Sequence, residues 1–287
     1  MIHRSLSSAT PDGNVITNNG MLTIMTSSSG NILGGFNSTG GGGIINNGTL
    51  TVLSGCNIVM NRGQEGGAVV NNAGASFTLS GGSLVMNEST QFGGGAVSNH
   101  GDMIMTDGTI SHNEAAMNGG GIWSEGTLTI NGCTITYNTC TDRGGGIYLS
   151  KGTLNLSGKL AILGSSCGEN DNNLYVNTGA VATCSGPLEK NSVIFMTFAA
   201  TPTSQSPKTV IRNVSGHTAQ LYSDREDCMV IVKVGNKNDE PGVATIVNSR
   251  LICMIQALRL FRVSVNNVFI PMGDSGYPGP CLFPCLH

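Results

Sequence analysis

A repeat of about 25 residues runs through most of this chain, and it restricts the possible folds more than any other feature. One complete copy is GGGIWSEGTLTINGCTITYN, residues 119–138. In this copy a glycine run precedes a short apolar pair and a polar turn. Two runs that alternate polar and apolar residues follow, 127–130 and 134–137, separated by a turn at Asn131-Gly132 and closed by Asn138. Alternation with a period of two predicts β-strands, so each copy is expected to contain three short strands and three corners.

Two independent markers show that the copies are true repeats. The apolar residue after the glycine run recurs in steps of 25, 28, 25, 25 and 27, at Ile44, Val69, Val97, Ile122, Ile147 and Leu174. The closing asparagine recurs in steps of 26, 26 and 25, at Asn61, Asn87, Asn113 and Asn138. This period is typical of leucine-rich repeats or parallel β-helices, and the L-x-x-L-x-L frame of the former is absent. The repeat therefore predicts an all-β fold, a single-stranded parallel β-helix (solenoid) of about seven coils.

The chemistry of the repeat positions indicates how the coils stack. Stacked coils lie about 4.8 Å apart and pair their backbone groups with the coils above and below, while inward Leu, Ile, Val and Met form a continuous core. The second strands begin with an outward polar row, at Thr49, Ser76, Thr127 and Thr153. Each closing asparagine is expected to bond the neighbouring coil through its amide and to adopt the left-handed backbone conformation of a corner. The glycine runs are expected at the other sharp corner, where a Cβ atom would clash.

The repeats do not fill the whole chain. We expect four segments: an N-terminal segment at 1–13, the β-helix repeats at 14–198, a β-rich capping region at 199–250 and an atypical tail at 251–287. The capping region contains two strand-like runs, 209–212 and 229–234, and a cap is expected because a bare terminal coil is an exposed sheet edge. The tail fits neither pattern, and its apolar run LICMIQALRLFRV is compatible with a short helix and equally with disorder.

The composition suits such a fold and excludes several classes of partner. Glycine makes up 42 of the 287 residues and charged residues only 11%, which favours turn-rich β structure over a disordered chain. The net charge of −3 and the pI of 5.9 give no basis for binding nucleic acid or an anionic membrane. No apolar run is long enough to span a bilayer as a helix. No Ca²⁺-binding nonapeptide or other cofactor motif occurs, so we expect no metal and no cofactor.

The nine cysteines and the first residues bear on the cellular location. The cysteine number is odd and no C-x-x-C pair occurs, which excludes a zinc ribbon and a simple disulfide scaffold. Cys56 and Cys133 hold the same repeat position and are expected to be small, semi-buried thiols. Cys140 and Cys167 lie at roughly equivalent corners of consecutive repeats, which allows a disulfide between them without requiring one. No apolar signal segment is visible before the first repeat, so the protein is either cytoplasmic or a fragment of a longer exported chain. We expect the fragment, because the first repeat begins almost at once, without a polar cap.

The repeat resembles those of two known groups of proteins. GGAV at 66–69 and 94–97, with the closing strings IVMN, LVMN, ISHN and ITYN, is similar to the GGA(I/L/V) and FxxN repeats of polymorphic outer-membrane proteins, with Ile or Leu in place of the motif's Phe. Those proteins are autotransporter adhesins of chlamydia-type bacteria. The GGGIY and GTLTI strings also resemble pectin-lyase-like β-helix surface proteins of gut bacteria. The resemblance covers residues 14–198 and implies a right-handed parallel β-helix on the cell surface.

Right-handed β-helices also include pectate lyases and polygalacturonases, so a carbohydrate-active enzyme is the alternative function. The polygalacturonase strings N-T-D, D-D, G-H-G and R-I-K are absent, and residues 41–171 hold four Lys or Arg against nine Asp or Glu, a balance that repels an acidic polysaccharide. The best acid–base candidates are His100, Asp102 and Glu125, because Glu125 is expected one coil above His100 and Asp102 across the same corner. The other interpretation is a solvated corner that accepts any polar residue. The equivalent residues elsewhere are Asn47, Asn72 and Ser150.

An aromatic row is the best candidate for ligand binding. The residue that follows the inward apolar residue is Trp123, Tyr148 and Tyr175 in three consecutive coils. If the apolar residues point inward, these three side chains point outward and stack about 5 Å apart, an arrangement that suits the apolar faces of sugars or a partner protein. The other interpretation is that the rings fill a groove under a loop or lean over the glycine corner.

Together these features predict a non-catalytic β-helix of the cell surface or extracellular space. It is expected to be an adhesin-like passenger or structural stalk that binds host or matrix glycans or proteins. The alternative is a pectin-lyase-like polysaccharide lyase or glycoside hydrolase. Regular coils with aromatic or Thr ladders outside favour the binding protein, and a convergent carboxylate cluster in a groove with a distorted coil favours the enzyme.

Overall fold

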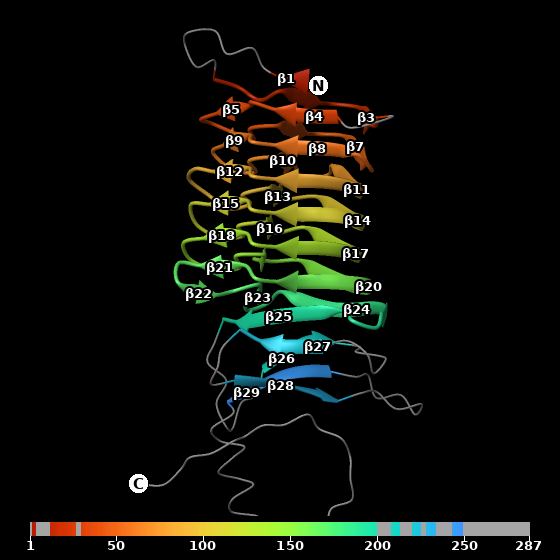
Figure 1. Ribbon diagram of the computed structural model, residues 1–287, viewed down its shortest axis with the longest axis vertical. Helices are drawn as coiled ribbons and strands as arrows, with labels where there is room; N and C mark the ends of the chain where they lie inside the picture. Colours follow the sequence, from red (N-terminus) through yellow and green to blue (C-terminus); the bar gives the residue numbers. More distant parts are fainter. Residues whose placement is uncertain are drawn as a thin grey trace, which may run out of the picture. The chain divides into compact units, whose positions relative to one another are not determined.

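A computed structural model describes residues 2–3, 12–26, 30–199, 208–212, 220–224, 228–233 and 243–248 of the chain. The described residues are all-β and contain no helix. Their strands stack as coils in the order of the sequence (Figure 1). The predicted parallel β-solenoid of about seven coils is therefore confirmed, and its right-handedness stays a prediction. The predicted tail at 251–287 lies outside the described residues.

The first column of strands follows the glycine corner. It contains seven parallel three-residue strands: β2 (Ile16–Asn18), β6 (Ile44–Asn46), β10 (Val69–Asn71), β13 (Val97–Asn99), β16 (Ile122–Ser124), β19 (Ile147–Leu149) and β23 (Leu174–Val176). The register sets the predicted inward residues opposite one another, as in Val97 with Ile122 and Ile122 with Ile147. The apolar marker of the repeat is therefore the first residue of each of these strands.

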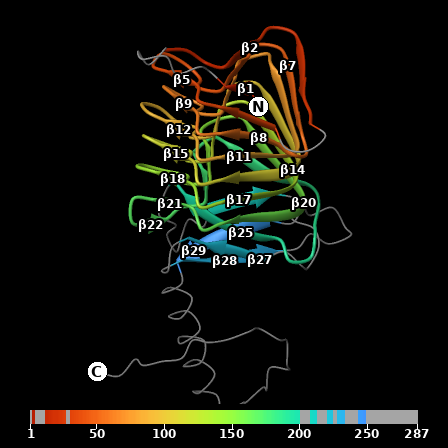
Figure 2. The same ribbon diagram turned by 45° about the horizontal axis from the view of Figure 1, so that its top comes forward.

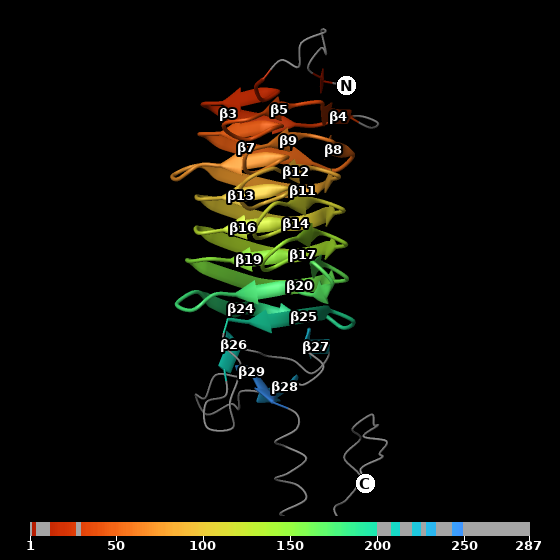
Figure 3. The same ribbon diagram turned by 90° about the vertical axis from the view of Figure 1, so that its left-hand side faces the viewer.

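The second column holds the long strands, which lie one above another in Figure 3. They are β3 (Met21–Ile24), β7 (Thr49–Leu53), β11 (Ser76–Val85), β14 (Asp102–Ser111), β17 (Thr127–Thr136), β20 (Thr153–Leu163) and β24 (Val181–Leu188). In three coils the long strand is interrupted, and its second half forms a strand of its own: β4 (Gly30–Leu33), β8 (Cys56–Val59) and β25 (Val193–Phe198). The turn predicted at Asn131-Gly132 is wrong, because β17 continues through it. Gly132, with a φ of 94°, bends the strand, and the register with β20 shifts at that point.

The third column consists of two-residue strands, four of which directly follow the closing asparagines. It runs along one edge of the stack in Figure 2 and contains β5 (Phe36–Asn37), β9 (Arg62–Gly63), β12 (Glu88–Ser89), β15 (Glu114–Ala115), β18 (Thr139–Cys140) and β21 (Ser166–Cys167). A last strand, β22 (Asn170–Asp171), pairs antiparallel with β21. The sequence placed the third strand at 134–137, which is instead the second half of β17. A strand of only two residues is too short to show the alternation by which strands are recognised in the sequence.

Inward side chains form one continuous core. One stack runs through five coils as Leu50, Phe77, Met103, Leu128 and Leu154, all completely buried and set opposite one another by the strand register. Complete burial of one such side chain stabilises the fold by roughly 1.5–3 kcal/mol. The two thiols predicted at the same repeat position, Cys56 and Cys133, are buried more completely than the semi-buried state predicted, with 1% and 5% of their surface exposed.

The closing asparagines form the predicted ladder between coils. The Asn61 amide donates to Asn87 Oδ1 at 3.1 Å, Asn87 donates to Asn113 Oδ1 at 3.0 Å, and Asn113 donates to Asn138 Oδ1 at 2.9 Å. The left-handed conformation predicted for these residues is wrong. It falls on the preceding residue, with φ between 54° and 56° at Met60, Met86, His112 and Tyr137. The reason is that the amide must point inward to bond the next coil, so the sharp bend is made one residue earlier.

A second asparagine ladder, missed from sequence, ends the first column. The side-chain amides of Asn18, Asn46 and Asn71 each donate to the Oδ1 atom of the asparagine in the next coil, at 2.7, 2.8 and 2.8 Å. The ladder continues from Asn99 to the Ser124 hydroxyl at 3.0 Å. These side chains also donate to backbone carbonyls of the second column, so the corner between the two columns is held by buried hydrogen bonds.

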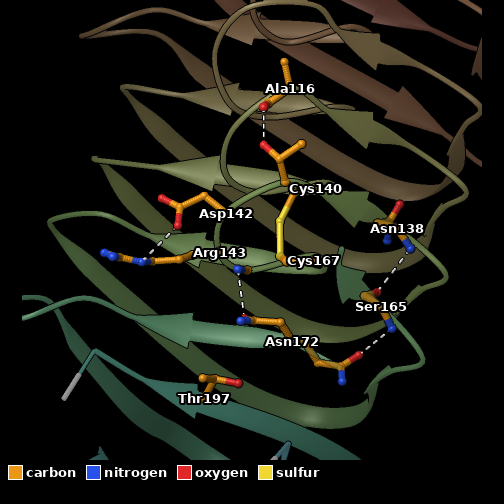
Figure 4. The surroundings of a disulfide bond; sticks show 12 residues. Ala116, Asn138, Cys140, Asp142, Arg143, Ser165, Cys167, Asn172 and Thr197 are labelled. Atoms are coloured by element: carbon orange, nitrogen blue, oxygen red, sulfur yellow. Dashed lines mark hydrogen bonds and ion pairs between the residues drawn. A yellow bond between two sulfur atoms is a disulfide. The ribbon is translucent and has the colours of Figure 1, made fainter. Parts of the chain in front are cut away.

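A disulfide joins Cys140 of β18 to Cys167 of β21 (Figure 4). The sequence allowed this bond, and the strand register makes it geometrically simple, because it sets the two residues directly opposite with their Cα atoms 4.6 Å apart. Both cysteines are buried beside Ala115 of the preceding coil. The disulfide therefore ties two neighbouring coils at the third column, next to the loop that contains Asp142 and Arg143.

Further strands follow the last coil. β26 (Lys208–Arg212) and β27 (Gln220–Ser223) pair in parallel with β24 and β25. β29 (Val243–Asn248) pairs antiparallel with β26 and with β28 (Cys228–Lys233). The two strand-like runs predicted at 209–212 and 229–234 are thus present as β26 and β28, and their role as a cap stays a prediction. At the other end β1 (Ile2–His3) pairs with β4.

Candidate functional site

The predicted aromatic row is in register, but most of it is covered. The first column sets Trp123 opposite Tyr148 and Tyr148 opposite Tyr175, and the two tyrosine ring centroids are 5.4 Å apart. The exposure predicted for the tyrosines is wrong, since they are only 8% and 4% exposed. The Arg143 guanidinium lies 5.5 Å from the Tyr175 ring centroid, so the loop before the glycine corner covers this part of the row. Only Trp123 remains partly exposed, and ligand binding by the three residues stays a prediction.

His100 lies beside Trp123 and contacts carboxylates from two other coils. Its Nε2 atom is 3.3 Å from Glu65 Oε2, and its Nδ1 atom is 3.9 Å from Glu125 Oε2. The predicted proximity of His100 and Glu125 is therefore confirmed. The imidazole and indole ring centroids are 5.0 Å apart in an edge-on arrangement. His100 thus links the polar corner to the aromatic row.

Glu65 is the partner that sequence reasoning missed. Its Oε2 atom accepts a hydrogen bond of 3.0 Å from the hydroxyl of Ser98, which is completely buried. Glu65 is 35 residues from His100, more than one repeat, and it lies in the loop before the glycine corner. The residues at the same place in the next coils, immediately before a glycine of positive φ, are Gly93, Asn118 and Arg143. No regular pattern therefore marks Glu65.

Asp102 does not belong to the cluster. It is the first residue of β14, in the outward row between Ser76 and Thr127, and its carboxylate forms no ion pair with His100 or another described residue. Lys151 does belong, because its ammonium lies 3.3 Å from Glu125 Oε1. The Lys151 side chain is 74% exposed, so its ion pair with Glu125 contributes little to stability.

The hydrogen bond between Glu65 and His100 shifts both pKa values. It raises the pKa of His100 above its ordinary value, helped by the charges of Glu65 and Glu125 and opposed by burial. The same bond to His100 lowers the pKa of Glu65, again against burial and with help from the Ser98 hydroxyl. Each group thus stabilises the charged form of the other. Glu65 is therefore a carboxylate throughout the neutral range, and His100 carries a proton over more of that range than a free histidine.

A cleft of about 330 Å³ opens beside this cluster. It is lined by Glu65, Phe92, Gly93, Met117, Asn118 and Trp123. Phe92 and Met117 are 48% and 45% exposed. The Oδ1 atom of Asn118 is buried and has no hydrogen-bond partner among the described residues. A mainly apolar lining with a few polar groups is typical of small-molecule sites, and the volume is near the lower end of their range, about 300 Å³.

Two small residues make room for the cleft. A Cβ atom on Gly93 would lie 2.7 Å from Trp123 Cδ1 and 2.7 Å from the Asn118 carbonyl oxygen, so the indole approaches the loop only because residue 93 has no side chain. Ser98 occupies the place in the row that Trp123 takes in the next coil, and it leaves space over which Glu65 reaches His100. The sequence signal for this coil is its step of 28 residues, the longest in the repeat, although only one of its three extra residues lies in the loop around Phe92 and the other two lie in the turn between β10 and β11.

A second hollow, of about 370 Å³, lies on the outer face of the second column, over β4, β8 and the end of β11. It is lined by Asn31, Leu33, Asn57, Val59, Met60 and Val85, and none of these residues is ionisable. Within the described residues, no group of three or more His, Cys, Asp or Glu side chains is placed to hold a metal ion. The cleft beside Trp123, with its ionisable neighbours, is therefore the candidate functional site.

The strand register and the stacked coils define the chain as a parallel β-solenoid repeat protein. In comparisons with protein-family models, curated proteins and solved structures, no significant match is found. No helix in the described part of the chain is long and apolar enough to cross a membrane.

Proposed function

We propose that this chain is the β-helix part of a cell-surface or secreted protein and that it binds glycan or protein ligands without catalysing a reaction. The observation that carries this proposal is the cleft beside Trp123. There an indole, the Phe92 ring and the Met117 thioether surround a carboxylate and an amide. Apolar ring surfaces with a few hydrogen-bonding groups are well suited to the apolar face of a sugar or to an anchoring side chain of a protein. The neighbouring coils instead repeat the same buried ladders.

The repeat itself supports a more specific assignment. Its GGAV strings and closing asparagines resemble polymorphic outer-membrane proteins, and its glycine corners resemble pectin-lyase-like surface proteins. We therefore propose an autotransporter-type adhesin passenger. The Cys140–Cys167 disulfide agrees with export, because such bonds persist mainly in oxidising compartments. Antibody labelling of intact source cells tests the location. Labelling without permeabilisation is expected, and labelling only after lysis would contradict the proposed location.

Binding is tested with arrays of glycans and matrix proteins. The double variant Trp123→Ala, Phe92→Ala removes both rings of the cleft and is expected to weaken any detected binding at least tenfold, since aromatic anchors dominate such contacts. Tyr137→Ala is the matched control, because this aromatic residue is 61% exposed at a different corner. Equal binding by the double variant and the wild type would show that the cleft is not the site.

A carbohydrate-active enzyme is the second candidate. The observation that favours it is the His100–Glu65 pair at the edge of the cleft, since a histidine and a carboxylate in contact can exchange protons with a substrate. Incubation with neutral and acidic polysaccharides, followed by product analysis, is expected to detect no turnover. If turnover is found, and His100→Asn and Glu65→Gln both abolish it while the fold remains intact, the enzyme replaces the binding protein.

A further inference from the structure

We propose that the cleft selects glycans that carry a protonated primary amine, such as oligosaccharides of deacetylated hexosamine. This inference rests on the proposed function, because it names the ligand class of the same cleft. It requires a fixed negative charge at the cleft, ring surfaces that favour a cation, and a shape that favours a sugar ring.

The fixed negative charge is Glu65. Both of its side-chain contacts use Oε2, and no described residue bonds Oε1, the oxygen left for a ligand. Its one cationic neighbour, His100, is shared with Glu125. The other cations nearby have carboxylate partners, Lys151 with Glu125 at 3.3 Å and Arg143 with the Asp142 carboxylate at 3.4 Å. The Glu65 carboxylate therefore has one oxygen, Oε1, that no described residue bonds and that can accept a hydrogen bond from a ligand.

The rings around Glu65 also favour a cation. Phe92 and Trp123 line the same cleft as the carboxylate, and an ammonium near the face of an aromatic ring is attracted by its quadrupole, most strongly for Trp. The Glu65 carboxylate can only accept hydrogen bonds, and an ammonium offers three donors and no acceptor. The polar chemistry of the cleft thus complements an amine.

The remaining lining favours a sugar ring over a flexible chain. The exposed Met117 and Phe92 side chains and the indole of Trp123 offer apolar surface on which the CH groups of a pyranose ring can pack. A lysine side chain carries the same ammonium but must lose more conformational freedom on binding, because its stem is flexible. Acidic sugars are disfavoured by the excess of nine Asp or Glu over four Lys or Arg in residues 41–171.

The test is isothermal titration of the full chain at mildly acidic pH, where the sugar amine is protonated. Three oligosaccharides of equal length are compared: one of glucosamine, its N-acetylated counterpart and a neutral glucose oligomer. The amine form is expected to bind at least tenfold more tightly than the other two, about 1.4 kcal/mol. Glu65→Gln is expected to abolish this preference, whereas Glu114→Gln, an exposed carboxylate of the third column, is expected to keep it.

Each other outcome decides against the inference in a different way. Equal binding of the three oligosaccharides, unaffected by Glu65→Gln, would overturn the selectivity and leave glycan binding standing. Binding of none of them would overturn both this inference and the glycan part of the proposed function. Binding of a lysine-rich peptide in place of the amine oligosaccharide would assign the cleft to a protein partner. If Glu65→Gln does not fold, Phe92→Leu is used, and an unchanged preference for the amine in that variant would refute the role of the ring.

Discussion

Replacing Asn113 by alanine is expected to be among the most destabilising single substitutions in the repeat region. Asn113 is in the middle of the ladder of closing asparagines and is 1% exposed. Its backbone N–H bonds Asn138 Oδ1 and is unaffected by the change. The substitution therefore removes only the side-chain amide, and the effect measures the ladder itself.

The magnitude follows from five hydrogen bonds. The Asn113 amide donates to the carbonyl oxygens of Leu84 and Ser111, both at 3.0 Å, and to Asn138 Oδ1 at 2.9 Å. Its Oδ1 atom accepts from the backbone N–H of Asn87 at 2.9 Å and from the Asn87 amide at 3.0 Å. Alanine leaves several of these buried groups without a partner, and each costs roughly 1–3 kcal/mol. Because some find other partners, the expected loss in the free energy of unfolding is about 3–5 kcal/mol.

Guanidinium denaturation followed by circular dichroism measures this loss, with midpoint and slope fitted together. Asn155→Ala is the matched control, since its side chain is only half-buried and makes one long hydrogen bond, 3.4 Å, to the Thr129 hydroxyl. The control is expected to lose no more than about 0.5 kcal/mol. A loss below about 1 kcal/mol for Asn113→Ala, or an equal loss in both variants, would refute the ladder as a major source of stability.

Three further predictions concern the disulfide and the cleft. Replacing both cysteines of the disulfide by Ala is expected to lower Tm, because a crosslink across 27 residues contributes up to about 3–4 kcal/mol to stability in the chain-entropy model. The Tm of this variant should no longer respond to reductant, and a Tm equal to that of the wild type would contradict the prediction. The Tm difference between wild type and His100→Asn is expected to be largest between the ordinary pKa values of Glu and His, 4.5 and 6.5. It should fall as the pH rises through the raised pKa of His100 and as the pH drops through the lowered pKa of Glu65; a flat profile would show that the pair does not couple to folding. Gly93→Ala is expected to displace the indole of Trp123, the single Trp of the chain, so its fluorescence emission should shift and ligand binding should weaken; unchanged emission would contradict the close approach.

The coil architecture could be predicted because it is written in two periodic markers. Residues such as Ile122 and Asn113 recur at almost constant steps, and stacking requires each to meet its own kind in the next coil. The Cys140–Cys167 bond could not be predicted in the same way, because the repeat placed the two cysteines only at roughly equivalent corners, whereas the strand register sets them directly opposite. Periodicity does not show which residue of a corner takes the strained backbone conformation, so the sequence predicts the left-handed φ at Asn138, whereas Tyr137 adopts it.

The cleft could be predicted only in part, because it depends on residues outside the periodic strands. Trp123, His100 and Glu125 lie in or next to the first column, where register predicts their neighbours. Glu65 and Phe92 lie in loops of unequal length, so no fixed step connects them to the column. The burial of the tyrosines was missed for the same reason, since it depends on a loop that places Arg143 over a ring.

The corner that precedes the closing asparagines has a consequence for engineering. Met60, Met86 and Tyr137 are 63%, 53% and 61% exposed, and each holds a positive φ that costs an ordinary residue about 1 kcal/mol. Because the next residue supplies the buried hydrogen bonds, the side chain at this corner is free to vary. The corner is therefore a row of substitution sites at intervals of about 4.8 Å. Chemical groups attached there would be displayed at a fixed molecular spacing.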